Sequence, residues 1–147
     1  MTMLSPGPFR NTTSQIIEQS VDQYLQQANY QYASNGVRIF VEHNQYLNNM
    51  PGMKEARGQI HERLQGMTGL ELVGLDEATI SQNGLVGTKI TARCLMMPFA
   101  KQMIYQIKLL MQDNNLWLVT ASYKECDTAG KQLVSAIMDS ISVNNTP

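Results

Sequence analysis

The chain has 147 residues, a formal net charge of −1 at pH 7 and only 16% charged residues. This length fits a single domain that buries a core without disulfides or metals. The near-neutral charge lacks the positive field that nucleic-acid-binding proteins use, so we expect no nucleic acid as a partner. The scarcity of charge also disfavours a site that depends on clustered carboxylates.

The first residues, MTMLSPGPFR, contain neither a basic start nor an apolar run of signal-peptide length. Pro6, Gly7 and Pro8 predict a flexible lead-in over 1–11, followed by one domain over 12–147. We therefore expect a cytoplasmic protein. The alternative is a periplasmic or envelope location, if a signal was removed from the given sequence.

An amphipathic helix is predicted over 12–29, where Thr12 and Gln15 have the spacing of a capping box. Its apolar stripe consists of Ile17, Val21, Tyr24, Leu25 and Ala28. A turn at 34–36 and a strand over 37–43 (VRIFVEH) follow. On this strand, alternation places Arg38, Phe40 and Glu42 on one face.

A second helix is predicted over 48–69, with Pro51 in its first turn and Gly66 or Gly69 at its end. Its buried stripe consists of Met53, Ala56, Ile60, Leu64 and Met67.

Four strands are predicted in succession, over 70–80, 85–97, 101–112 and 116–125. Asn83-Gly84 and Asp113-Asn114-Asn115 are turn sequences, and such short connections predict an antiparallel meander. The last helix is predicted over 127–142, with Asp127 as its N-cap. Its apolar face consists of Leu133, Val134, Ile137, Met138 and Ile141.

The element order α-β-α-β-β-β-β-α predicts an α+β fold in which three amphipathic helices pack on an antiparallel sheet. Cys94 and Cys126 fall about two strands apart near one end of this sheet, or about 10 Å. A disulfide needs Cα atoms within about 7 Å, so we expect two free thiols.

The sequence contains no catalytic or metal-binding motif, so we expect no cofactor, no metal and no catalytic residue. His43 and His61 are the only histidines, and neither belongs to an HExxH or clustered-ligand pattern. Trp117 is interpreted as a core or rim anchor rather than as a ligand-stacking residue. One enzymatic alternative remains: Cys126 precedes a helix N-terminus, which favours a thiolate, and either histidine could serve as its base.

The methionine-rich stretch at 95–111, LMMPFAKQMIYQIKLLM, does not fit a membrane-spanning helix. Lys101 and Lys108 interrupt it, Pro98 splits it, and a span needs about 20 apolar residues. We interpret it as two strands joined at 98–100.

The second face of these two strands is otherwise polar, yet it carries four apolar residues. These residues form a candidate client-binding strip: Leu95, Met97, Ile104 and Leu110. Methionine-rich surfaces adapt to partners of varied shape. The alternative is that the N-terminal helix or a second subunit covers the strip.

A family resemblance begins near residue 54. A helix is followed by LVGLDEATISQNGLVGTKITARC, then KQMIYQIKLLMQDNNLWLVTASYKE, then an amphipathic helix. This order resembles the Mog1/PsbP-like fold and is most similar to its DcrB-type domains, which include chaperone-adaptors of type VI secretion effectors. The first third departs from the family, because a Gln-rich helix is predicted where the family has a strand hairpin. The lipoprotein cysteine near the N-terminus is also missing.

The resemblance implies a non-enzymatic adaptor, in which an apolar groove on the sheet holds a transmembrane segment of a secreted effector, commonly as a homodimer. It also leaves an alternative, an envelope-associated structural or interaction domain. We therefore expect a protein partner and no membrane span in this chain.

Overall fold

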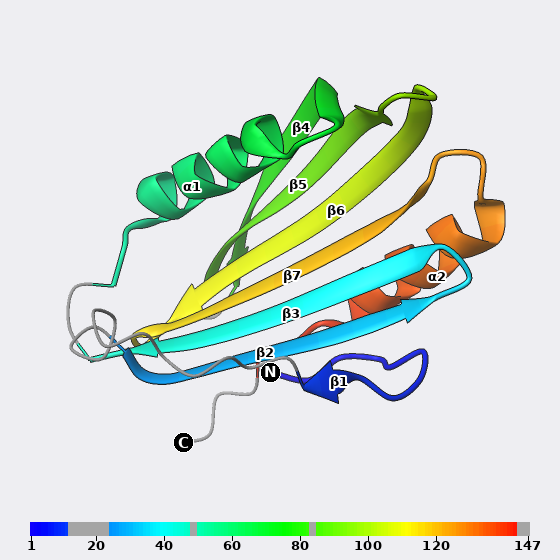
Figure 1. Ribbon diagram of the computed structural model, residues 1–147. Helices are drawn as coiled ribbons and strands as arrows, with labels where there is room; N and C mark the ends of the chain where they lie inside the picture. The colour runs from blue at the N-terminus through cyan, green and yellow to red at the C-terminus, as the bar shows by residue number, and fades with distance from the viewer. Residues whose placement is uncertain (12–23, 48–49, 83–84, 144–147) are drawn as a thin grey trace.

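A computed structural model describes residues 1–11, 24–47, 50–82 and 85–143 of the chain. Strands form one antiparallel sheet in the order β1-β2-β3-β7-β6-β5-β4, and two helices pack on it (Figure 1). The elements are β1 (Arg10–Asn11), β2 (Tyr24–Ser34), β3 (Val37–Tyr46), α1 (Met53–Gly66), β4 (Leu70–Gln82), β5 (Leu85–Met96), β6 (Lys101–Gln112), β7 (Asn115–Lys124) and α2 (Thr128–Ser140). The predicted α+β class is confirmed.

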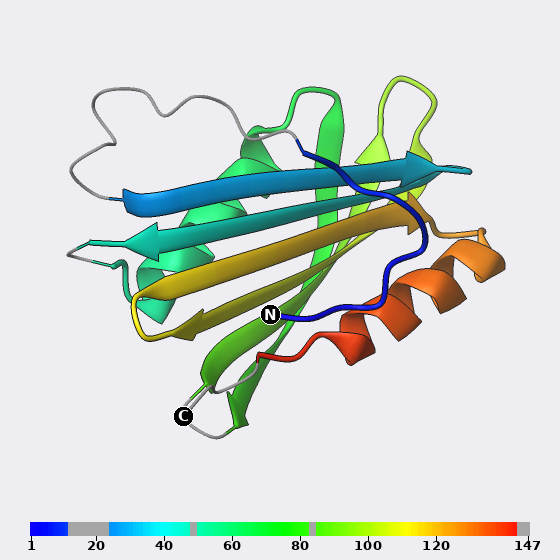
Figure 2. The ribbon, with the colours of Figure 1, turned by 90° about the horizontal axis from the view of Figure 1, so that it is seen from below.

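The two helices lie on opposite faces of the sheet. Figure 2 shows α2 in front of the sheet and α1 behind it. The reason lies in β6 and β7, where apolar residues occur at consecutive positions. The segments Leu109–Met111 and Leu116–Val119 are buried throughout. Because successive side chains on a strand point to opposite faces, both faces need cover.

The α2-side core forms between the apolar face of α2 and alternate residues of β3, β6 and β7. Its most enclosed members are Ile39, Leu110, Val119, Val134 and Ile137. Asp127 caps α2 as predicted, since its side chain accepts a hydrogen bond of 2.9 Å from the Gly130 N–H.

The N-terminal segment also belongs to this side of the molecule. Met1, Met3 and Phe9 pack against the α2-side core. Thr2 and Ser142 exchange two backbone hydrogen bonds of 2.8 and 3.0 Å. The predicted lead-in therefore contributes strand β1 and a bridge to the end of the chain.

The α1-side core uses the other face of the same strands. The helix buries Ala56, Ile60 and Leu64, which confirms the centre of the predicted stripe. They pack with residues of β5, β6 and β7 that include Ile90, Cys94, Ile107, Leu109 and Leu118. The helix begins at Met53 with Gly52 as its N-cap, so Pro51 precedes the first turn rather than lying in it.

The helix predicted over 12–29 is wrong for residues 24–29, which belong to strand β2; residues 12–23 lie outside the described part. Ten registered pairs join β2 to β3. Asn35 (φ 52°) and Gly36 (φ 81°) form the connecting turn, a conformation that suits Asn-Gly. Pairing of β2 with β3 thus prevails over the helical periodicity of residues 24–29. The described residues therefore contain a strand hairpin where the sequence predicted a helix.

The remaining strands lie close to their predicted ranges. The methionine-rich stretch forms the end of β5, a turn over 97–100 and strand β6, as predicted. Within the described residues, neither helix has the length and apolarity that a bilayer-spanning helix needs.

Candidate functional site

Two of the four residues of the predicted client-binding strip are buried. Leu110 is 1% exposed and Ile104 is 8% exposed, and both belong to the α2-side core. Leu95 is half-buried, and Met97 lies 48% exposed in the turn after β5. Ile104 and Leu110 share their core with Val134 and Ile137 of α2, so this helix covers that part of the face.

Polar residues on the same face are also satisfied internally. Lys108 donates a 3.0 Å hydrogen bond to the Met138 carbonyl near the end of α2. Gln106 donates to the Tyr123 hydroxyl at 3.1 Å. Burial, and then the charge of Lys89, lower the pKa of Lys108, while Asp139 acts in the opposite direction. On β6, this face is an internal packing surface.

A pocket of about 320 Å³ lies on the opposite face, between α1 and the sheet. Helix α1 packs along β4 and β5. Part of the same face, over β6, β7 and β3, therefore lies uncovered beside the helix. One wall of the pocket is formed by Ile60 and Leu64 of α1 and by Met67, which follows the helix. Residues of β2, β3, β6 and β7 line its floor: Asn29, Tyr30, Phe40, Tyr105, Ile107, Leu118 and Thr120.

The lining is mostly apolar, and three of its large side chains remain in contact with solvent: Tyr30, Phe40 and Met67. Phe40 is 43% exposed and Met67 is 42% exposed. Phe40 shares one face of β3 with the charged residues Arg38 and Glu42, as alternation predicted. A phenylalanine on a face that is otherwise charged was the sequence signal for this site. Met67 was expected in the buried stripe of α1, but it comes after the last residue of the helix and lies at the pocket.

A pair of opposite charges borders the pocket. Arg63 of α1 and Glu42 of β3 both line it, and Arg63 Nη1 lies 3.7 Å from Glu42 Oε2. Their side chains are 65% and 28% exposed. An exposed pair of this kind contributes about 0–1 kcal/mol to stability. The pair is therefore a weak tie between α1 and the β3 side of the sheet.

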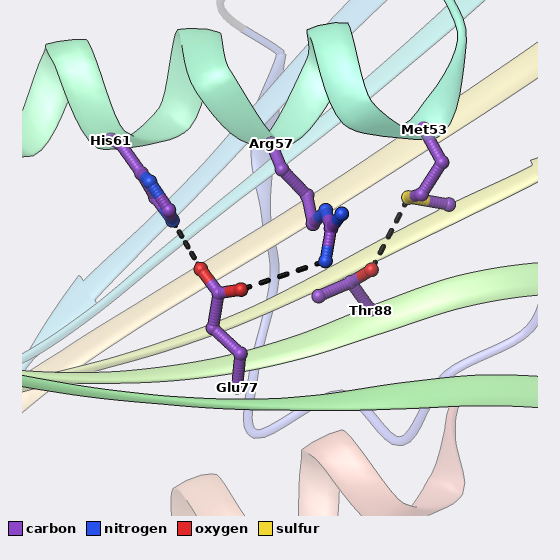
Figure 3. A network of polar contacts seen from close by, with 5 residues as sticks. All are labelled: Met53, Arg57, His61, Glu77 and Thr88. Atoms are coloured by element: carbon purple, nitrogen blue, oxygen red, sulfur yellow. Dashed lines mark hydrogen bonds and ion pairs between the residues drawn. The ribbon is translucent and has the colours of Figure 1, made fainter.

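On its other side, α1 is anchored to β4 and β5 by polar contacts (Figure 3). Glu77 of β4 binds His61 through Oε1 and lies 3.6 Å from Arg57 Nη1 through Oε2. Thr88 donates to the Met53 sulfur at 3.2 Å. His61 thus serves as a contact between helix and strand.

His43 and Cys126, one of the two pairings in the thiol-enzyme alternative, lie far apart. His43 pairs with Trp117 across β3 and β7, stacks on it with ring centroids 5.1 Å apart, and contacts Asn115 Oδ1 at 2.9 Å. Cys126 follows the opposite end of β7, seven residues from Trp117 to Lys124. At about 3.3 Å per residue this separation exceeds 20 Å.

The other predicted chemistry-bearing residues have packing roles. Both cysteines are free thiols, as predicted, with Cys94 buried and Cys126 exposed. Burial raises the pKa of the Cys94 thiol, which suits a small core residue. Trp117 is 8% exposed in the α2-side core, which confirms its interpretation. Among the described residues, no three His, Cys, Asp or Glu side chains cluster as metal ligands.

Comparison with known proteins identifies a shared fold without an activity. No family model matches the chain, and no curated protein matches it. The crystal structure of PA94, a protein of unknown function from Pseudomonas aeruginosa, superposes with a TM-score of 0.58 at 10% sequence identity. The match covers 95% of this chain and 100% of the other. At this identity, the likeness shows that the two chains share an overall architecture.

Proposed function

We propose that this protein is a non-enzymatic binding or adaptor protein that holds an apolar segment of a protein partner at the pocket beside α1. The observation that carries the proposal is the pocket itself: an opening of about 320 Å³ with a mostly apolar lining and two exposed apolar side chains at its edge, Phe40 and Met67.

The size of the pocket limits what enters it. Ligand pockets typically measure about 300–1,000 Å³, and a cavity of about 150 Å³ holds one benzene ring. This pocket therefore has room for one or two large side chains and not for a whole helix, whose diameter is about 10 Å. A bound segment inserts its largest side chains and rests the remainder on Phe40 and Met67. Methionine suits such a shelf because it is flexible and polarizable.

The resemblance seen in the sequence adds a finer proposal, which is that the partner is a secreted effector and the segment one of its transmembrane helices. We place the site on the α1 face of the sheet instead of on the strip predicted from the sequence, and we propose the same class of client. We also propose a homodimer, in which the pockets of two subunits bind one client.

A matched pair of phenylalanine variants tests the proposal. Phe40 lines the pocket, whereas Phe99 lies 80% exposed in the turn after β5 and does not line it. A fluorescent peptide with a Leu/Ala-rich sequence of about 20 residues serves as the client, and anisotropy measures its affinity. We expect Phe40→Asp to weaken binding at least tenfold and Phe99→Asp to leave it within twofold.

Two results would contradict the proposal. If wild-type protein does not bind the peptide, the pocket does not accept apolar segments. If the two variants weaken binding equally, the peptide adheres to any exposed apolar residue.

A further inference from the structure

The mouth of the pocket carries a donor and an acceptor side by side. Arg63 and Glu42 lie 3.7 Å apart between Nη1 and Oε2. At this distance their charges attract, but the gap is longer than the 2.7–3.2 Å typical of an N–H···O hydrogen bond. A guanidinium group can only donate hydrogen bonds, and an ionised carboxylate can only accept them. A neutral group that both accepts and donates would complement the two together.

We propose that this pair recognises a carboxamide, presented by an Asn or Gln side chain within the apolar partner segment. The inference rests on the proposed function and adds a polar determinant to it. The amide oxygen accepts from Arg63, and the amide NH₂ donates to Glu42.

The geometry of the pair fits a carboxamide well. Bond lengths place the oxygen and nitrogen of an amide about 2.2 Å apart. Two hydrogen bonds of about 2.9 Å then lean outward by only about 15° to reach atoms separated by the observed 3.7 Å. A single hydroxyl oxygen bridging the same two atoms at about 2.8 Å would subtend only about 80°, which is too narrow for two well-aligned bonds.

Charged groups fit the pair less well. A carboxylate on the segment would meet Glu42, and an ammonium group would meet Arg63, so each gains one attraction and one repulsion. An apolar group offers neither bond and removes water from both charges. The pair therefore favours a neutral amide over the other side chains of similar length.

The exposure of the pair sets the size of the preference. Hydrogen bonds to charged groups are stronger than neutral ones, but the 65% and 28% exposed side chains remain accessible to water and salt. We expect about a tenfold preference for an amide over an apolar side chain of the same length, which corresponds to about 1.4 kcal/mol.

Four peptides and four forms of the protein test the inference. The peptides share one Leu/Ala-rich sequence and differ at a single central residue, which is Gln, Met, Glu or Lys; Met matches Gln in length without its amide. We expect wild type to bind the Gln peptide about tenfold more tightly than the Met peptide. Arg63→Leu and Glu42→Leu should each reduce this ratio below about twofold. The double variant R63E/E42R should restore it, because the donor and acceptor exchange places.

The outcomes separate this inference from the function on which it rests. Equal affinity of wild type for the Gln and Met peptides overturns the inference, as does a preference that survives in both leucine variants. The proposed function stands in either case if Phe40→Asp still weakens all four peptides. Failure of wild type to bind any peptide overturns both. Circular dichroism melts show whether each variant is folded.

Discussion

Leu110 offers a direct test of which face of the sheet is internal. The sequence placed it in a surface strip, whereas the structure leaves it 1% exposed beneath α2. Replacing it with alanine removes three carbons, or roughly 2.4 kcal/mol of transfer free energy at about 0.8 kcal/mol each. The facing residue on β5 is Gly87, which has no side chain to fill the space, so a cavity term adds to this. We expect Leu110→Ala to lower the free energy of unfolding by about 3–4 kcal/mol.

Urea denaturation of wild type, Leu110→Ala and Met97→Ala measures the effect. Met97 belongs to the same predicted strip but is 48% exposed, so its truncation should change stability by about 0.5 kcal/mol or less. At roughly 3 °C per kcal/mol, the leucine variant should also melt about 10 °C lower. Because the pocket lies on the other face, folded Leu110→Ala should bind the apolar peptide as wild type does. A loss below 1 kcal/mol, or a loss of peptide binding without a loss of stability, would refute the burial argument.

Further predictions concern two cysteines, two glycines and Lys108. Under native conditions Cys126 should react with an alkylating reagent at the rate of an exposed thiol, while buried Cys94 should react only on unfolding. A mass-spectrometric time course in which both thiols react equally fast would contradict this. Gly58→Ala, at an open position of α1, should stabilise the protein by about 0.5–1 kcal/mol. By contrast, Gly87→Ala should destabilise it by about 1–3 kcal/mol, because the new Cβ would lie 2.9 Å from a backbone carbonyl; urea titrations showing the same sign for both would count against the packing. Burial, and then a neighbouring lysine charge, lower the pKa of Lys108 below its ordinary value of 10.5. Lys108 therefore loses its proton at a lower pH in the folded state than in the unfolded state. The unfolding free energy of wild type relative to Lys108→Met should then rise as pH passes from the folded pKa towards 10.5. A flat or falling difference between pH 7.5 and pH 10 would contradict this assignment.

The sequence predicted the C-terminal half of the fold well because local signals and long-range packing agree there. Turn sequences separate the strands predicted there, and Asp127 caps α2 where its spacing to an apolar stripe indicated. The first helix failed for residues 24–29 because Tyr24, Leu25 and Ala28 fit a helical stripe and an edge strand equally well. Only pairing with β3, which local periodicity does not encode, decides between them.

The site could be predicted only in part. Alternation along β3 correctly grouped Phe40 with Glu42, and the spacing along α1 placed Ile60 and Leu64 on its buried face. What the sequence could not supply was the position of α1 across the sheet, which decides how much of the face stays uncovered. The same limit explains the misplaced strip, because the face that α2 covers depends on the path of the chain after β7.

The burial of β6 and β7 on both faces has a consequence for local opening of the fold. Amide hydrogens of Leu109–Met111 and Leu116–Val119 lie on two inner strands of the sheet with cores above and below them, so they should exchange with solvent only on global unfolding. Helix α1, joined to the sheet by a narrow stripe and exposed ion pairs, should exchange sooner. The pocket would then have a rigid floor and a wall that opens locally, and a bound segment would slow exchange in α1 while leaving β6 unchanged.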